Sequence, residues 1–118
     1  MRVIATRGYE RAAGRLLTAE ARAAAEAEIV ARPDAWPVIP GTGGARKARI
    51  ALPGRGKRGG ARVIYFVLLT ADMLFLFDIY AKNAKEDLSS ADKQDLRDAI
   101  AELHAADRAR AAPGSGGA

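Results

Sequence analysis

Two apolar runs separated by a short turn decide the fold: Arg62-Val63-Ile64-Tyr65-Phe66-Val67-Leu68-Leu69-Thr70 and Met73-Leu74-Phe75-Leu76-Phe77-Asp78-Ile79-Tyr80. Both runs are rich in β-branched and aromatic residues, which favour strands. Ala71 and Asp72 form a link short enough for a hairpin, so we predict an antiparallel pair. Neither face of the first run is cleanly polar. That pattern indicates central strands, covered on one side and partly sheltered on the other.

Upstream of this pair, Arg46–Leu52 predicts a third strand. A turn at Gly41–Gly44 feeds it, and Pro53–Gly60 is expected to be a basic, glycine-rich loop. Met1–Ala5 predicts a short edge strand. Because side chains alternate along a strand, we expect two sides in the third strand: Arg46, Ala48, Ile50 and Leu52 on one, and Lys47, Arg49 and Ala51 on the other.

Helices are expected on both flanks of the strands. The apolar spacing predicts one helix over Gly8–Leu17, and an alanine-rich second helix over Ala19–Ala31, with Thr18 as its N-cap. A last helix is capped by Ser89 or Ser90, with Ser89 and Asp92 as a variant capping box. Its apolar stripe is Leu96, Ile100 and Leu103. We predict a single domain over residues 1–106 and a disordered tail over 107–118.

Positive charge is concentrated in the middle of the chain. The protein has 118 residues and a net charge of +5. Residues 38–83 carry eight bases and two acids, whereas residues 84–118 carry five bases and seven acids. From Arg46 to Arg62 there are seven bases and no acid, which predicts an array without a local counter-charge. Such a distribution favours a polyanionic partner, most plausibly RNA.

Several other kinds of site are excluded. A phosphate-binding P-loop ending at Gly56-Lys57 would need glycine at Ala51 and serine or threonine at Arg58. There is no cysteine, and the single histidine, His104, is most simply a surface group near a helix end. We therefore expect no cofactor and no metal. The apolar runs are shorter than the ~20 residues of a membrane span, so we expect a cytoplasmic protein.

RNA can be cut through its own 2′-hydroxyl group. The chemistry requires an acceptor for the hydroxyl proton, cations on the scissile phosphate, and a proton donor for the leaving 5′-oxygen. A lysine crowded by other cations releases its proton more readily and can act as the acceptor. Arginine cannot, but its fork suits phosphate. The tyrosines nearest the array, Tyr65 and Tyr80, offer stacking surfaces or phenolic hydroxyls. Trp36 is expected to plug the edge of the core, with stacking on a base as the alternative.

Three blocks of the chain resemble the RelE/HigB family of bacterial type II toxin–antitoxin toxins. The blocks are Gly41-Thr42-Gly43-Gly44-Ala45-Arg46-Lys47-Ala48-Arg49, then Gly56-Lys57-Arg58-Gly59-Gly60-Ala61-Arg62-Val63-Ile64-Tyr65, then Ile79-Tyr80-Ala81-Lys82-Asn83-Ala84-Lys85-Glu86-Asp87-Leu88-Ser89. The resemblance implies an α+β fold of the RelE/ParE type. In that fold, N-terminal helices pack on a small, twisted, mainly antiparallel sheet that is followed by a C-terminal helix.

The resemblance also implies a toxin that cuts messenger RNA on the ribosome, without a metal, by 2′-hydroxyl attack. A cognate antitoxin, commonly with a helix-turn-helix domain, would neutralise it. By position, Arg49 and Arg62 are the implied phosphate clamps, and Lys47, or else Lys57 or Lys82, is the proton carrier. We assigned the contacts to the RNA backbone and bases to Arg46, Lys57, Arg58, Tyr65 and Tyr80.

The chain departs from the family at one catalytic position. Some members have a tyrosine beyond the last strand, close to the place of Ser89, and others use a histidine; here the nearest phenol is Tyr80. Two alternative functions remain open. One is a ParE-like inhibitor of DNA gyrase, which shares the fold. The other is a basic nucleic-acid-binding module without catalysis.

Overall fold

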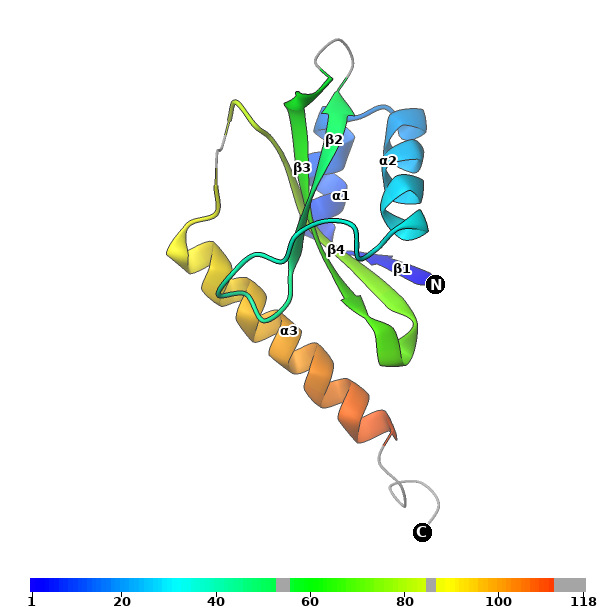
Figure 1. Cartoon of the computed structure of the whole chain (residues 1–118), viewed down its shortest axis with the longest axis vertical. Coiled ribbons are helices and arrows are strands. Elements are labelled where there is room, and N and C mark those ends of the chain that lie inside the picture. Colours follow the sequence, from blue (N-terminus) through cyan, green and yellow to red (C-terminus); the bar gives the residue numbers. More distant parts are fainter. Residues whose placement is uncertain (53–55, 85–86, 112–118) are drawn as a thin grey trace.

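The computed structural model describes residues 1–52, 56–84 and 87–111, except for the side chains of residues 57–59. Within these residues the chain forms an α+β fold with three helices, a short 3₁₀ turn and one four-stranded sheet (Figure 1). The expected fold class is therefore confirmed. None of the described helices is long and apolar enough to cross a membrane.

The N-terminal part forms strand β1 (Arg2–Ala5), helix α1 (Arg7–Leu16) and helix α2 (Ala19–Ala31). Thr18 caps α2 as predicted, because its hydroxyl accepts a hydrogen bond from the Ala21 amide. Thr6 caps α1 in the same way through the Tyr9 amide, a cap that the sequence analysis did not identify. Side-chain acceptors of this kind satisfy amides that the first turn of a helix leaves without partners.

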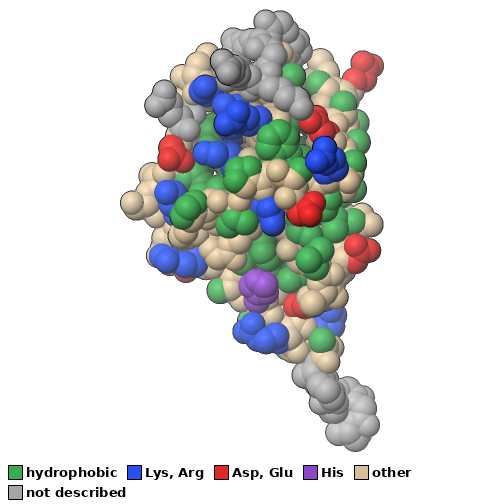
Figure 2. All heavy atoms as spheres, in the orientation of Figure 1, with side chains coloured by type: hydrophobic (Ala, Val, Ile, Leu, Met, Phe, Trp, Pro, Cys, Tyr) green, Lys and Arg blue, Asp and Glu red, His purple; other side chains and the backbone are tan. Residues whose placement is uncertain are grey.

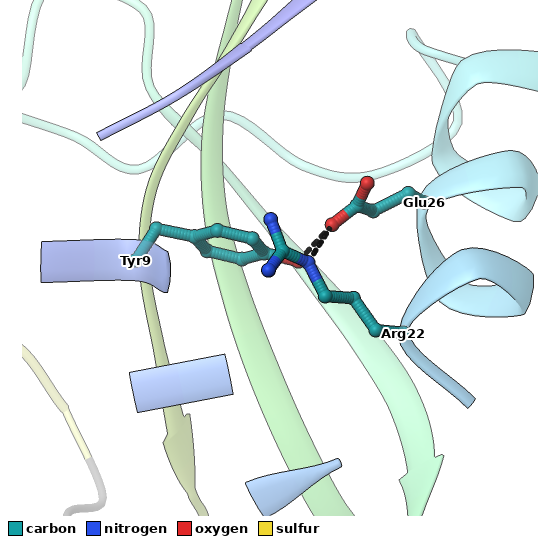
Figure 3. A network of polar contacts seen from close by, with 3 residues as sticks. All are labelled: Tyr9, Arg22 and Glu26. Atoms are coloured by element: carbon teal, nitrogen blue, oxygen red, sulfur yellow. Dashed lines mark hydrogen bonds and ion pairs between the residues drawn. The ribbon is translucent and has the colours of Figure 1, made fainter. Parts of the chain in front are cut away.

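A polar network joins the two N-terminal helices (Figure 3). The buried Tyr9 hydroxyl donates to Glu26 Oε2 at 2.9 Å, and Arg22 Nε donates to the same oxygen at 2.7 Å. The Arg22 guanidinium also lies 5.1 Å from the centre of the Tyr9 ring. One carboxylate thus receives two donors, and this fixes α2 against α1.

The sheet has the order β1-β4-β3-β2, where β2 is Arg46–Leu52, β3 is Gly56–Leu68 and β4 is Met73–Ala81. All neighbours are antiparallel except β1, which runs parallel to β4. The predicted hairpin is correct in pairing, but β3 ends at Leu68. A 3₁₀ turn (Leu69–Ala71) and the left-handed Asp72 complete the link to β4.

The loop predicted over Pro53–Gly60 is wrong from Gly56 onward, where β3 already begins. Its glycines have low strand propensity, yet the segment pairs with neighbours on both sides. Gly56 is the register partner of Leu52, and the Gly60 carbonyl accepts the Lys82 amide. Residues 53–55 lie outside the described part of the chain.

The core has two parts, one on each face of the sheet. Side chains of α1 and α2, among them Tyr9 and Ile29, pack on one face with Val63 and Leu76. The other face carries residues of α3, where Ile100 is 1% exposed. Figure 1 shows α1 behind the strands, α2 to their right, and α3 running diagonally along the lower left of the sheet. The first run of the hairpin is therefore covered on both faces, consistent with its mixed apolar pattern.

The connector between α2 and β2 returns along the edge of the sheet. Thr42 is fully buried there; its hydroxyl donates to the Ile39 carbonyl and accepts from the Ala45 amide. Gly44 has a φ of 126°, a backbone conformation that other residues rarely adopt. Trp36 packs at the margin of the core, as expected. The glycine-rich segment thus acts as the turn that feeds β2.

Helix α3 spans Ser90–Ala111 and begins with the predicted capping box. Ser89 Oγ accepts from the Asp92 amide, and Asp92 Oδ2 accepts from the Ser89 amide, both at 3.0 Å. The helix continues past residue 106, so the expected tail begins too early: Asp107 is helical and bonds to Thr70 and Arg110. Residues 112–118 lie outside the described part of the chain.

Candidate nucleic-acid interface

Strand pairing aligns three predicted site residues across the sheet. Arg62 on β3 is the register partner of both Arg49 on β2 and Tyr80 on β4. Paired residues of an antiparallel sheet point to the same face. Tyr80 packs in the core cluster of α3, so this row of three lies on the α3 face. Lys47, two residues before Arg49, shares that face because side chains alternate along a strand. Ala81 packs on the opposite face, so Lys82, which directly follows it, is also directed to the α3 face.

Exposure varies widely along this row. Arg49 and Lys82 are exposed, whereas Arg62 and Tyr80 are each only 7% exposed. Arg62 Nη1 donates to the Ala61 carbonyl at 3.2 Å. Arg62 therefore supplies positive charge from beneath the surface, and Arg49 presents an accessible guanidinium. In Figure 2, one group of Lys and Arg side chains lies in the upper part of the molecule, and others are distributed over the rest of this face.

Tyr80 is held in its neutral form. Burial raises the pKa of its phenol, and the carboxylates of Asp87, Asp78 and Asp92 raise it further, whereas Arg62 acts in the opposite direction. A phenol with a raised pKa keeps its proton near neutral pH. In this position Tyr80 can donate a proton or a hydrogen bond, but it is unsuited to accept the proton of a 2′-hydroxyl.

The basic array has a local counter-charge, contrary to our inference from the sequence. Asp87, which belongs to the segment just before α3, places its Oδ1 3.8 Å from the Nζ of Lys47 on β2. The carboxylate is distant in sequence, and the return of the chain toward α3 brings it back to β2. No local sequence signal pointed to Asp87; only the capping box at Ser89 shows that the chain must turn at this place.

Arg46 and Tyr65 lie on the opposite face from this row, so the structure does not bring them together with Arg49 and Arg62. Alternation directs them away from Lys47 and Arg49, toward the α1 and α2 side. Arg46 Nη1 donates to the Trp36 carbonyl at 2.5 Å and to that of Asp34 at 3.3 Å. Tyr65 is fully buried, and its hydroxyl donates to the Pro33 carbonyl at 2.6 Å. Both side chains hold the connector.

Two further predicted residues cannot be placed in full. Lys57 and Arg58 fall in the first part of β3, and their side chains lie outside the described part of the structure. His104 and Trp36 both contact the apolar part of the protein. His104 contacts the Phe66 ring edge-on with ring centres 5.4 Å apart, and Trp36 lies at the core margin.

The comparison with known protein families agrees with this arrangement of strands and helices. A family described as the RelE toxin of the RelE / RelB toxin-antitoxin system matches residues 1–112, which is nearly the whole chain. The match includes the three strands that carry the basic row and the helix that covers their face. The protein belongs to the RelE family of toxins from toxin–antitoxin systems.

Proposed function

We propose that this toxin is a ribosome-dependent mRNA interferase that cuts messenger RNA by 2′-hydroxyl attack, without a metal. The observation that carries the proposal is the row of Arg49, Arg62 and Tyr80 across three strands, flanked on the same face by Lys47 and Lys82. Cations held on a rigid sheet can stabilise charge that develops on a phosphate, because the scaffold has fixed their positions in advance.

The residues divide the chemistry as follows. The 2′-oxygen attacks the adjacent phosphorus, and the bond from phosphorus to the 5′-oxygen breaks, which leaves a cyclic phosphate and a 5′-hydroxyl. Arg49 binds the phosphate oxygens through its fork, and the buried charge of Arg62 stabilises the same group from below. Lys47, Lys57 or Lys82 takes the 2′-hydroxyl proton. The neutral phenol of Tyr80 is a donor suited to the leaving oxygen.

The partners follow from the family and from the charge. A toxin of this family has a cognate antitoxin. We propose that this antitoxin carries a helix-turn-helix domain and that an acidic segment of it covers the basic row. The ribosome positions the message against the same row, which places the activity in the cytoplasm. The net charge of +5 suits both kinds of surface.

Expression of the chain from a tightly controlled promoter tests the proposal. Arrested translation with cleaved messages is the expected result. DNA damage with intact translation would instead identify a gyrase inhibitor, and harmless expression would leave a binding module or an inactive toxin.

Arg49→Ala gives the residue-level test, because this exposed side chain can be removed without disturbing the core. The loss of one preorganised cation should slow message cleavage by about 10²–10³-fold. Arg11→Ala on α1 removes an equal charge from the layer on the other side of the sheet and should leave cleavage unchanged. Arg62→Ala should also abolish growth arrest, and thermal unfolding followed by circular dichroism reports whether that buried variant still folds.

A further inference from the structure

A small cavity of about 210 Å³ lies between the connector and the beginning of α3. Its charged lining residues are Lys47 from β2, Asp87 from the segment before α3, and Lys93 from the first turn of α3. Pro37 and Pro40 form part of the wall. Two lysines from different elements therefore line the same small cavity as one carboxylate.

Two lysines and one backbone amide favour the ionised form of this carboxylate. The Leu88 amide donates to Asp87 Oδ1 at 2.8 Å, and Lys47 Nζ lies 3.8 Å from the same oxygen. The Leu88 amide, then Lys47 and more weakly Lys93, hold the pKa of Asp87 below its usual range. Leu88 itself is buried in the core of the α3 face, which fixes the direction of its amide. The groups around the cavity thus stabilise a negative charge at this position.

We propose that Lys47 and Lys93 form a second phosphate-binding site of the RNA-binding face, and that Asp87 occupies this site until RNA displaces it. The inference rests on the proposed function, because an RNA strand is the ligand whose phosphates would replace the carboxylate. It adds Lys93 and the first turn of α3 to the substrate-binding surface, which none of the sequence motifs indicated.

The position of the site agrees with an extended RNA strand. Lys47 is two residues from Arg49 on the same face of β2, a separation of roughly 7 Å along the strand. One phosphate bound at Arg49 leaves Lys47 to bind a neighbouring phosphate of the same strand as a cation, and with this site Lys57 or Lys82 takes the 2′-hydroxyl proton. The side chain of Asp87 is 65% exposed, so its ion pair with Lys47 is a surface pair that a phosphate can displace.

Binding of a short 2′-O-methylated RNA oligonucleotide, followed by fluorescence anisotropy at several salt concentrations, tests the site. The methyl group blocks attack, so only binding is measured. Lys93→Ala should weaken binding and reduce the slope of log affinity against log salt by about 0.7, the value for one phosphate contact to a single strand. Arg11→Ala is the matched control for the lost charge and should change neither quantity.

Asp87→Asn should bind the oligonucleotide up to about fivefold more tightly, the largest effect expected from loss of a competing surface ion pair. Asparagine keeps an oxygen that can accept the Leu88 amide, so the local turn is preserved. Glu102→Gln on the exposed part of α3 makes the same charge change away from the cavity. The Leu88 amide resonance should also shift when RNA is added to the wild type, because its carboxylate acceptor moves.

The second site is refuted if the wild type does not bind the oligonucleotide, or if Lys93→Ala behaves like Arg11→Ala. An Asp87→Asn protein that binds no more tightly than Glu102→Gln also refutes it. The proposed function is tested by a different experiment, and it is refuted if the wild-type protein leaves messages intact on ribosomes. If the Lys93 and Asp87 effects persist in that case, the site stands as a general nucleic-acid contact.

Discussion

Tyr9→Phe removes one hydroxyl from the network that joins α1 to α2 and leaves the ring in place. The lost bond runs from the buried phenol to Glu26 Oε2 at 2.9 Å, and Arg22 keeps its own bond to that oxygen at 2.7 Å. Hydrogen bonds to charged groups contribute about 1.5–3 kcal/mol. Because Glu26 remains paired, the lower part of this range applies, about 1.5–2 kcal/mol.

This loss of free energy of unfolding should lower the melting temperature by roughly 6–9 °C, given an unfolding entropy near 2.1 cal/mol/K per residue. Urea unfolding followed by circular dichroism measures the free energy directly. Tyr65→Phe is the matched control, since its hydroxyl donates to the uncharged Pro33 carbonyl and should cost only about 1 kcal/mol. A Tyr9→Phe protein as stable as the wild type would refute the assigned role of the network.

The same substitution predicts a change in pH dependence. Burial, followed by the bond to Glu26, raises the pKa of Tyr9 above its ordinary value of 10.0. Above about pH 10 the unfolded state ionises while the folded state keeps its proton, so stability falls as pH rises, by up to about 1.4 kcal/mol per pH unit for this group. Unfolding measured between about pH 10 and 11 should show a shallower decline in Tyr9→Phe. An equal slope in both proteins would contradict the reasoning.

Two further predictions concern the backbone. Gly44→Ala should lose about 2 kcal/mol or more, because its φ is 126° and an added Cβ would lie 3.2 Å from the Phe66 ring. Gly14→Ala, in the last turn of α1 where an added Cβ meets open space, should gain about 0.5–1 kcal/mol, and thermal unfolding compares the two. Ser89→Ala should cost about 1 kcal/mol and speed hydrogen exchange at the Asp92 amide, its capping partner. Equal stabilities of the two glycine variants, or unchanged exchange at Asp92, would contradict these expectations.

Local patterns were sufficient to predict most elements of the fold. The alanine-rich run gave α2 with its Thr18 cap, the apolar runs gave β3 and β4, and Ser89 with Asp92 gave the start of α3. The start of β3 could not be predicted, because Gly56 and its neighbours have low strand propensity and are extended only through pairing with β2 and the end of β4. The parallel pairing of β1 with β4 is likewise a long-range property.

The candidate site was only partly predictable for a related reason. Alternation along β2 correctly separated Lys47 and Arg49 from Arg46, but it could not show which side α3 would cover. The nearness of Tyr65 in sequence suggested an RNA contact, whereas its place in the strand directs it into the core. Asp87 lies far along the chain from Lys47, and only the tertiary fold brings the two charges together.

One irregularity in β4 decides which residues share the site. Before it, Tyr65 pairs with Leu76, and after it Ile64 pairs with Asp78, so β4 contains one extra residue at Phe77. An extra residue of this kind reverses the faces of everything that follows. In a strictly alternating strand, Tyr80 would share the face of Leu76, against α1 and α2.

Polar groups stabilise this β-bulge at Phe77 through hydrogen bonds to the backbone. The Thr6 hydroxyl donates to the Phe77 carbonyl at 3.0 Å, and Asp78 Oδ1 accepts the Ile79 amide at 2.8 Å. These bonds satisfy backbone groups at the point where the regular ladder is interrupted. Thr6 also caps α1, so the layer behind the sheet stabilises the bulge that directs Tyr80 to the front. The alignment of Arg62 with Tyr80 therefore depends on contacts made on the opposite side of the sheet, which explains why neither charge nor hydrophobic pattern could reveal it.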